Sequence, residues 1–279
     1  MKTLNVFVNP DSDAAAEAYA MLRRCASVYN IALHEKWSPE NCDPIVTIGG
    51  DGTMIRALNT YPDNPVLGIN TGTLGFLTEV DANEGAMLDA MERISNGRFE
   101  EERAHRLVYT IERPQNKMPS GVEYETIDEG FAINDIVVAR NCALDGINFS
   151  VRVNGHIVNR IFADGYVVAS PVGASAYALS CGGPLVQPSA DVLVLSAIAP
   201  HSLVNRSMVI DGLESTVTIE IERLRNPQVK AIACADGVNA VPLQPFDKIE
   251  VKVDGGKYPS FIRFNSNRFF DRVSRRLCK

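Results

Sequence analysis

The sequence predicts an α/β N-terminal domain with a parallel sheet, followed by a mainly antiparallel β domain. Two observations lead to this fold class. In residues 1–100, short uninterrupted apolar strands alternate with helical patterns, as in a parallel sheet covered on both faces. In residues 101–260, strands with alternating polar and apolar residues follow one another between turns, which indicates antiparallel pairing. Residues 261–279 form a C-terminal segment that we expect to return to the first domain.

The elements of the first domain follow from their periodicity. Residues 15–29 carry apolar side chains at helical spacing, and Asp11 and Asp13 suit the start of that helix. A second helical pattern is ended by an Asn-Gly pair. The expected order is a strand at 4–9, a helix to residue 29, a strand at 44–48, a helical turn at 54–58, a strand at 65–69 and a helix at 84–94.

The second domain is predicted to consist mostly of strands. Residues 113–130 are polar and rich in turn formers, so we expect a hairpin loop there. Residues 173–179 are small and suit a short helix, and residues 268–279 look like a basic helix. The expected strands are 108–112, 133–139, 147–153, 165–169, 192–197, 217–221, 229–234, 249–253 and 261–264.

Composition and charge exclude several classes of protein. The 279 residues are 46% apolar and 22% charged, which excludes a disordered chain and a coiled coil. The net charge of −7 disfavours nucleic acids and membrane surfaces as partners. A run of about 18 apolar residues and a signal-peptide pattern are both missing, so we expect a cytoplasmic protein. The six cysteines contain no CxxC spacing and are expected to be reduced.

The strongest local feature is the pentapeptide Gly49-Gly50-Asp51-Gly52-Thr53, between a buried strand and a helix. Its three glycines permit close approach of a ligand and positive φ angles. Exposed amides beside a helix N-terminus favour phosphate oxygens. A carboxylate there repels phosphate, so Asp51 is either a general base for a hydroxyl nucleophile or a carboxylate linked to Mg²⁺. For the pentapeptide alone, a tight turn with a capping Asp is the alternative.

Other nucleotide and catalytic motifs are missing from the sequence. It has neither the GxxxxGK[ST] pattern of P-loop proteins nor GxGxxG, which disfavours a P-loop NTPase or a dehydrogenase. Residues 173–177 resemble GxSxG but lack the second glycine, which disfavours a hydrolase nucleophile. The four histidines are isolated, so we assign no metal ligands.

Several motifs taken together resemble the NAD kinase family, and the resemblance covers nearly the whole chain. The pentapeptide at 49–53 is shared with diacylglycerol and sphingosine kinases, whereas the run at 70–78, Asn-Thr-Gly-Thr-Leu-Gly-Phe-Leu-Thr, is much more specific to NAD kinases. Further matches follow in the family's order: Asn134-Asp135, Asp164-Gly165, residues 170–184, Pro200-His201-Ser202-Leu203, Asp236-Gly237 and Phe269-Phe270-Asp271.

The resemblance implies an NAD kinase, a phosphotransferase with an alcohol group as acceptor. Such an enzyme moves the γ-phosphoryl group of ATP to the 2′-hydroxyl of the adenosine ribose of NAD and gives NADP. Asp51 would be the base, Mg²⁺ or another divalent metal would offset negative charge, and Arg56 would contact a phosphate or carry a solvated charge.

The resemblance also implies which residues bind the nucleotides. Asn134 and Asp135 would hold the adenine end of NAD, Asp164 would contact its nicotinamide end, and Tyr177 would stack on a ring. The full set of expected binding residues is Gly50, Asp51, Gly52, Thr53, Arg56, Asn70, Asn134, Asp135, Asp164, Ser175, Ala176, Tyr177 and Ser180.

Two positions depart from the family pattern. Phe162 stands two residues before Asp164, where the family usually has a basic residue. Val172 replaces a hydroxyl residue of the family's Thr-Pro-Thr/Ser segment. Both changes affect the expected contacts to the dinucleotide and leave Asp51 in place.

Two other functions stay open at this stage. One is a lipid or other small-hydroxyl kinase that shares the pentapeptide, although no stretch suited to membrane docking accompanies it. The other is a non-catalytic dinucleotide-binding protein, which would not need a carboxylate at Asp51. The resemblance further implies a homodimer or homotetramer with the β domain at the interface.

Overall fold

The computed structural model describes residues 2–38, 40–72, 75–118, 121–142, 145–224, 230–265 and 268–277. Its contacts divide the chain into two compact units: unit 1 comprises Met1–Ala104 and Tyr258–Lys279, and unit 2 comprises His105–Lys257. The sequence placed the domain borders after residues 100 and 260. Val229, which begins one expected strand, and residues 278–279 of the expected C-terminal helix lie outside the described residues.

Unit 1 is built on a seven-stranded, mostly parallel sheet with the order β2-β1-β3-β4-β19-β6, in which β5 pairs with β4. All its described pairs are parallel except β19 with β6. Every residue of β3 is buried, as expected for a strand covered on both faces. The strands are β1 (Lys2–Val8), β2 (Ile31–His34), β3 (Ile45–Gly49), β4 (Val66–Asn70), β5 (Val80–Asp81), β6 (Glu100–Arg103) and β19 (Ser260–Arg263).

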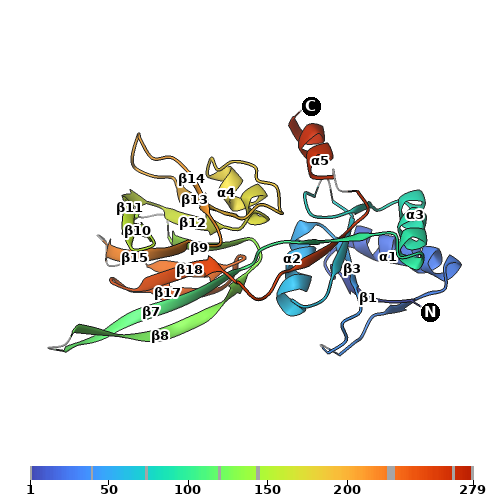
Figure 1. Cartoon of the computed structure of the whole chain (residues 1–279), viewed down its shortest axis with the longest axis horizontal. Helices are drawn as coiled ribbons and strands as arrows, with labels where there is room; N and C mark the ends of the chain where they lie inside the picture. Colours follow the sequence, from blue (N-terminus) through green and yellow to red (C-terminus); the bar gives the residue numbers. More distant parts are fainter. Residues whose placement is uncertain are drawn as a thin grey trace. The chain divides into compact units, whose positions relative to one another are not determined.

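Helices cover both faces of this sheet. α1 (Asp13–Val28) and α3 (Glu84–Ser95) pack together on one face, and α2 (Asp51–Thr60) lies on the other (Figure 1). The helix α1 begins at Asp13, as the sequence suggested, and its cap is Ser12, whose hydroxyl accepts the Ala15 amide. The helix α5 (Arg268–Leu277) ends the described chain.

The chain returns to unit 1 after it has completed unit 2. Strand β19 lies between β4 and β6, where it pairs in parallel with β4 and antiparallel with β6. Its Phe261 and Ile262 are fully buried. The C-terminal residues therefore form part of the core of the sheet that carries Asp51.

Unit 2 is a sandwich of two six-stranded sheets whose described pairs are all antiparallel, and one large apolar core lies between them. This confirms the predicted fold class. One sheet has the order β11 (His156–Ala163), β10 (Ile147–Val153), β15 (Thr216–Leu224), β18 (Lys248–Val253), β7 (Leu107–Met118) and β8 (Gly121–Ala132). The other has the order β14 (Met208–Asp211), β13 (Val192–Ile198), β12 (Gly165–Ala169), β9 (Asp135–Arg140), β16 (Ala231–Ala235) and β17 (Val238–Leu243).

The expected hairpin loop at 113–130 is wrong. Strands β7 and β8 continue through this segment as a long hairpin, in which Tyr109 pairs with Gly130 and Lys117 with Val122. The register shifts at two places along the hairpin. Its outer strand β8 is an edge strand, so it tolerates the polar residues that suggested a loop.

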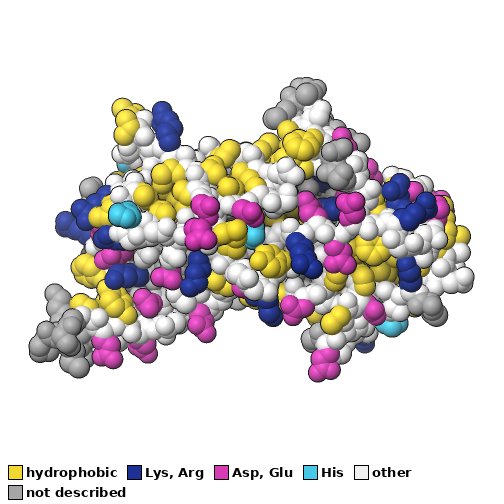
Figure 2. All heavy atoms as spheres, in the orientation of Figure 1, with side chains coloured by type: hydrophobic (Ala, Val, Ile, Leu, Met, Phe, Trp, Pro, Cys, Tyr) yellow, Lys and Arg dark blue, Asp and Glu magenta, His cyan; other side chains and the backbone are white. Residues whose placement is uncertain are grey.

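The short helical elements η1 (Gly173–Ser175) and α4 (Tyr177–Ser180) agree with the predicted short helix. Ala174 and Ala178 pack on the outer face of the second sheet, against Val137, Val167 and Val194. Basic and acidic side chains are interspersed on the face drawn in Figure 2. None of the helices in the described part of the chain has the length and apolar character of a membrane span.

Candidate active site

A cavity of about 420 Å³ lies at the carboxyl ends of β1 and β3 and is lined by Asn9, Gly50, Gly52, Thr53 and Arg56. Strand β1 has β2 on one side and β3 on the other, so the chain changes direction across the sheet at this point. Ligands of parallel α/β sheets bind outside the carboxyl ends of the strands at such switch points. The cavity is therefore the expected ligand site of unit 1.

The three glycines of the pentapeptide have different structural roles. A Cβ atom at Gly49 would lie 2.2 Å from Oγ1 of Thr53, so Gly49 is needed for the packing of α2 on β3. A Cβ atom at Gly50 or Gly52 would meet no described atom within 4 Å. None of the three uses the positive φ that glycine permits. Gly50 and Gly52 instead leave the cavity wall free of side chains.

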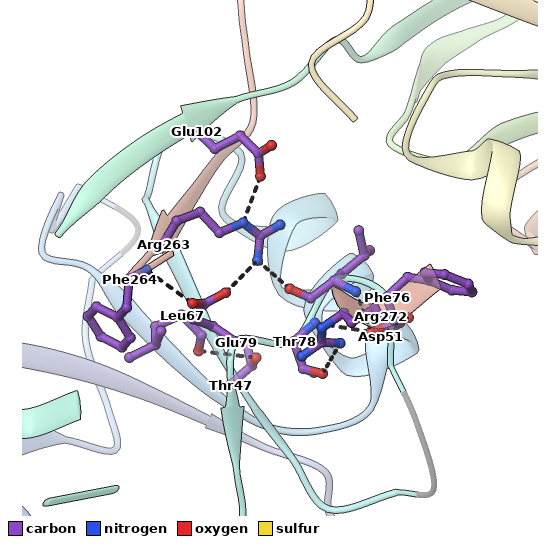
Figure 3. Close-up of polar contacts among 11 residues, drawn as sticks. Thr47, Asp51, Leu67, Phe76, Thr78, Glu79, Glu102, Arg263, Phe264 and Arg272 are labelled. Carbon is purple, nitrogen blue, oxygen red and sulfur yellow. Dashed lines mark hydrogen bonds and ion pairs between the residues drawn. The ribbon is translucent and has the colours of Figure 1, made fainter. Parts of the chain in front are cut away.

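The carboxylate of Asp51, the first residue of α2, accepts three consecutive backbone amides (Figure 3). Oδ2 accepts the amide of Phe76 at 2.6 Å, and Oδ1 accepts those of Leu77 at 3.0 Å and Thr78 at 3.2 Å. A Cβ atom at Gly75 would lie 2.4 Å from Oδ1, so this close approach requires glycine. The four residues 75–78 belong to the family-specific motif, and their backbone holds the catalytic candidate in one orientation.

Arg56 and Asn70 complete the polar surroundings in unit 1. Arg56 is exposed, and its Nη2 donates to Oδ1 of Asn9 at 3.2 Å, with the guanidinium also 6.0 Å from the ring of Phe7. Asn70 ends β4 beside Gly49, and its Oδ1 accepts the Gly72 amide at 3.1 Å. Gly50, Asp51, Gly52, Thr53, Arg56 and Asn70 thus lie at the same edge of one sheet.

A second carboxylate of this kind lies in unit 2. Asp236, between β16 and β17, accepts the amides of Ile133 at 2.8 Å, Asn134 at 2.7 Å and Asp135 at 3.1 Å. Its φ of 49° is in the left-handed region, which Asp tolerates better than most residues. Asp236 therefore fixes the backbone of the Asn134-Asp135 pair.

The carboxyl group of Asp135 is buried beside Asp236, with the residue 6% exposed. Burial and then the charge of Asp236 raise the pKa of Asp135 to about 7. Burial is the largest cause that raises the pKa of the Cys181 and Cys234 thiols, and the charge of Asp135 is the second largest. Asp135 can therefore donate or accept a hydrogen bond near neutral pH.

Asn134 has an unsatisfied buried atom. Its Oδ1 has no hydrogen-bond partner among the described residues, whereas such atoms are normally paired. A Cβ atom at Gly173 would lie 2.0 Å from the Asn134 carbonyl oxygen, so Gly173 allows η1 to approach this strand end. The buried Ser170 accepts the Gly173 amide at 3.1 Å and donates to the Ile133 carbonyl at 2.6 Å. The Asn134 side chain is thus an acceptor available to a ligand.

Four of the expected binding residues belong to the adjacent helical elements. Ser175 is half-buried and donates to the Val172 carbonyl at 3.2 Å, and Ala176 lies between η1 and α4. Tyr177 is 43% exposed; partial burial first, then the charges of Cys181, Asp164 and Asp135, raise the pKa of its hydroxyl. Ser180 is the exposed last residue of α4. The structure thus brings Tyr177 and Asp135 close enough to interact.

Asp164 has a cationic partner that the sequence did not suggest. Nη2 of Arg140 donates to Oδ2 of Asp164 at 2.7 Å, and both side chains are partly buried. Phe162, which replaces the family's basic residue, packs its ring against His201 at a centroid distance of 4.7 Å. Val172, 2% exposed, is buried. Arg140 therefore provides positive charge beside Asp164 in a chain that has Phe at position 162.

A protein-built metal cage is missing from the part of the chain that the structure describes, since no group of three His, Cys, Asp or Glu residues converges there. Asp51 is the only carboxylate of the pentapeptide, and its Oδ2 accepts one backbone amide where a carboxylate oxygen can accept about two hydrogen bonds. One carboxylate suits Mg²⁺ that is held mainly by water and substrate phosphates.

Three residues of the candidate site were not predicted from the sequence. Asn9 was not predicted, although a polar residue directly after the first strand of a parallel sheet is a usable signal. Asp236 was part of a quoted motif but was not chosen as a site residue, and Arg140 gave no signal because its partner is 24 residues away.

Comparison with known proteins shows which family the chain matches. Residues 5–99 match the family model of the ATP-NAD kinase N-terminal domain, and residues 133–264 match that of the ATP-NAD kinase C-terminal domain. The NAD kinase of Marinomonas sp. is 36% identical over 220 residues, which are 78% of this chain and 70% of that protein. The NAD kinase of Methanosarcina acetivorans is 33% identical over 245 residues, 87% of this chain and 81% of that protein.

Solved structures have the same fold. A crystal structure of an NAD kinase from Archaeoglobus fulgidus in complex with ATP superimposes with a TM-score of 0.72 at 27% identity, covering 98% of both chains. The yeast NADH kinase complexed with NADH gives a TM-score of 0.78 over 98% of this chain and 86% of that one, at 21% identity. On the two matched family models and these relatives, the chain belongs to the ATP-NAD kinase family.

Proposed function

We propose that this chain is an NAD kinase that transfers the γ-phosphoryl group of ATP to the 2′-hydroxyl of the adenosine ribose of NAD. The observation that carries the proposal is the Asp51 carboxylate, which three backbone amides orient and whose sequence neighbours Gly50 and Gly52 line the cavity. A hydroxyl is a weak nucleophile, and phosphoryl transfer depends on its orientation and on the stabilisation of charge.

Asp51 acts as the general base in this proposal. Oδ1 accepts two amides and Oδ2 one, so Oδ2 has an acceptor position left for the ribose hydroxyl. The hydroxyl proton passes to Oδ2 as the bond from the 2′-oxygen to the γ-phosphorus forms. The bond from that phosphorus to the bridging oxygen breaks, and ADP leaves.

The phosphates of ATP bind at the cavity wall made by Gly50 and Gly52. Both positions leave open space, and the amides at the N-terminus of α2 favour anions. Arg56, beside Asn9 in the same cavity, contributes a positive charge, and Thr53 and Asn70 frame the site. A bound Mg²⁺, for which Asp51 is the available carboxylate, would offset the negative charge of the phosphates.

NAD binds through the residues of unit 2. The unpaired Oδ1 of Asn134 accepts from the adenine amino group, and Asp135, with a pKa of about 7, binds a ribose hydroxyl as donor or acceptor. Asp164 contacts the nicotinamide amide while it remains paired with Arg140. The exposed ring of Tyr177 stacks on a base, and the pocket is completed by Ser175, Ala176 and Ser180.

The assembly and location of the protein are part of the same proposal. We propose a homodimer or homotetramer formed through unit 2, in which Leu203 and Val204 are 97% and 84% exposed. The cysteine pattern of the sequence supports a cytoplasmic location.

The activity assay is direct. Purified protein with ATP, Mg²⁺ and NAD is expected to form NADP, which a coupled NADP-dependent dehydrogenase detects. NAD binding without NADP would contradict the proposal and favour a non-catalytic binding protein. Phosphorylation of diacylglycerol or sphingosine in lipid vesicles, with no formation of NADP, would favour the lipid kinase.

The phosphate-binding role of the cavity can be tested at Gly52. Gly52→Ala adds a methyl group where no described atom lies within 4 Å, so stability should stay equal or rise by up to about 1 kcal/mol. The KM for ATP should rise about tenfold because the methyl group occupies the phosphate position. Gly85→Ala is the matched control, since Gly85 is also the exposed second residue of a helix, α3, and contacts no cavity residue. Equal KM values in both variants would contradict the role.

A further inference from the structure

Residues 76–79, here called the holding segment, connect Asp51 to the returning C-terminal chain. Phe76, Leu77 and Thr78 donate their amides to Asp51, and Glu79 follows directly. All four residues are buried, between 1% and 8% exposed. The geometry of Asp51 therefore depends on what fixes this segment from its other side.

Arg263 of β19 provides the main contact (Figure 3). Its Nη1 donates to the Leu77 carbonyl at 2.6 Å and lies 3.5 Å from Oε2 of Glu79, while Nε donates to Oε2 of Glu102 at 2.6 Å. Arg263 is 8% exposed and its guanidinium carbon lies 4.9 Å from the ring of Phe261. Three acceptors and one ring thus determine where the guanidinium points.

Two further contacts come from the same returning chain. Oε1 of Glu79 accepts the Phe264 amide at 3.0 Å. Nη1 of Arg272, on α5 and 5% exposed, donates to Oγ1 of Thr78 at 3.3 Å. The C-terminal residues therefore contact the holding segment at three successive positions.

The peptide unit between Leu77 and Thr78 is bound at both ends. Its carbonyl accepts from Arg263, and its N–H donates to Oδ1 of Asp51. A peptide unit is planar, so a rotation that frees the carbonyl also turns the N–H away from Asp51. A hydrogen bond from a guanidinium is charge-assisted and polarises the peptide, which strengthens the bond at its other end.

We propose that Arg263 is a positioning residue for Asp51, acting through the Leu77–Thr78 peptide. The inference rests on the proposed function, in which Asp51 is the base. A purely structural role for Arg263 is the alternative, since buried ion pairs are by themselves weak evidence of any specific role. The two roles differ in what they couple to: positioning depends on Asp51, and a structural role does not.

The test is a double-mutant cycle of Arg263→Lys and Asp51→Asn. Lysine keeps the charge but lacks the planar fork that reaches Glu102 and the Leu77 carbonyl together. Arg263→Lys should lower kcat about tenfold or more, with KM for ATP and NAD within about twofold. In the Asp51→Asn background it should cause no further loss of kcat.

Hydrogen exchange gives a second readout that needs no activity. The amides of Phe76, Leu77 and Thr78 should exchange faster in Arg263→Lys, and the double variant should exchange no faster than Asp51→Asn alone. If the rate of Asp51→Asn is too low to measure, these exchange rates replace kcat in the double-mutant cycle.

Arg113→Lys is the matched control. Arg113 binds the buried Asp247 through two bonds of 3.0 and 2.7 Å within unit 2. This variant should lose comparable stability and keep the wild-type kcat and the protection of residues 76–78. A folded Arg263→Lys with wild-type kcat, or one with equal losses in both backgrounds, would overturn the inference. Wild-type activity in Asp51→Asn would instead overturn the base role of Asp51.

Glu102→Gln replaces Arg263→Lys if the lysine variant shows no cooperative unfolding transition. It keeps the guanidinium and weakens only the outer bond to Arg263. The expected loss of kcat is about two- to fivefold, again absent in the Asp51→Asn background. A folded Glu102→Gln with wild-type kcat and wild-type exchange would overturn the inference.

Discussion

Two regions of the molecule use the same device for different ends. In unit 1 the carboxylate of Asp51 binds the amides of residues 76–78, and in unit 2 that of Asp236 binds the amides of residues 133–135. The distances fall between 2.6 and 3.2 Å in both. In each case one carboxylate accepts hydrogen bonds from three consecutive backbone N–H groups, which therefore need no acceptor on a neighbouring strand.

The surroundings of the two carboxylates differ. Asp51 begins a helix next to an open cavity, and the segment it binds is held by the buried cation Arg263. Asp236 lies in a turn, and its charge raises the pKa of the buried carboxyl group of Asp135. Backbone contacts therefore determine where each carboxylate lies, while its neighbours determine which chemistry it can perform.

The largest expected effect is on catalysis at Asp51. Asp51→Asn should lower kcat by about 10²- to 10⁴-fold, because an amide cannot take up the hydroxyl proton. Steady-state NADP formation measures the rate, and calorimetric titration should find NAD binding retained. Turnover close to that of the wild type would show that Asp51 is not the base. Asp51 and Asp236 would then both be structural carboxylates.

The matching change in unit 2 should act on stability. Asp236→Asn replaces one carboxylate oxygen by an NH2 group, which cannot accept a backbone amide. We expect a loss of about 2–3 kcal/mol in the free energy of unfolding. Urea denaturation measures it. Asp211→Asn is the control, since that exposed residue accepts one amide, from Glu214, and should lose less than about 1 kcal/mol. Equal losses of unfolding free energy in the two variants would show that the three hydrogen bonds of Asp236 stabilise the protein no more than the single one of Asp211.

The smallest expected effect is a dependence of stability on pH that comes from Asp135 in unit 2. The pKa of Asp135 is about 7 when folded and about 3.9 in an unfolded chain. Between these values the folded state holds a proton that the unfolded chain has lost, so stability falls as the pH rises from about 4 to 7. Asp135→Asn removes this slope.

The stability of Asp135→Asn relative to the wild type should therefore increase by about 1–3 kcal/mol between pH 5 and pH 8. Denaturant midpoints measured across this range test the sign. A constant difference between the two proteins would mean that Asp135 titrates as an exposed carboxyl group.

Apart from the two-residue strand β5, the strands that sequence patterns missed all lie at the edge of a sheet. The three sheets end at β2 and β6, β11 and β8, and β14 and β17, and each of these six strands was left out or taken for a loop. An edge strand has one strand neighbour and is partly solvated, so it need not carry a regular apolar pattern. β6, for example, is Glu-Glu-Glu-Arg, and only its pairing with β19 makes it a strand.

The candidate site was predicted where its residues are close in sequence. The pentapeptide at 49–53 and the run at 70–78 lie after neighbouring strands, so a local pattern was enough to find Asp51. The reason for Gly75 was not visible, because the Cβ clash involves Asp51, 24 residues earlier. Arg263 carried no signal at all, since its contacts with Glu79 and Glu102 span more than 160 positions.

The sequence by itself determined the two-domain fold class, the family and the chemical identity of Asp51, because periodicity and local motifs record burial and backbone shape over a few residues. Only the tertiary structure decided that residues 76–78 hold this carboxylate and that Asp236 holds the strand end at 133–135. The sequence predicted that residues 261–279 return to the first domain, but only the tertiary structure placed Arg263 on a strand between β4 and β6. Such contacts join distant residues through hydrogen bonds whose directions depend on the folded backbone, which a linear pattern does not contain.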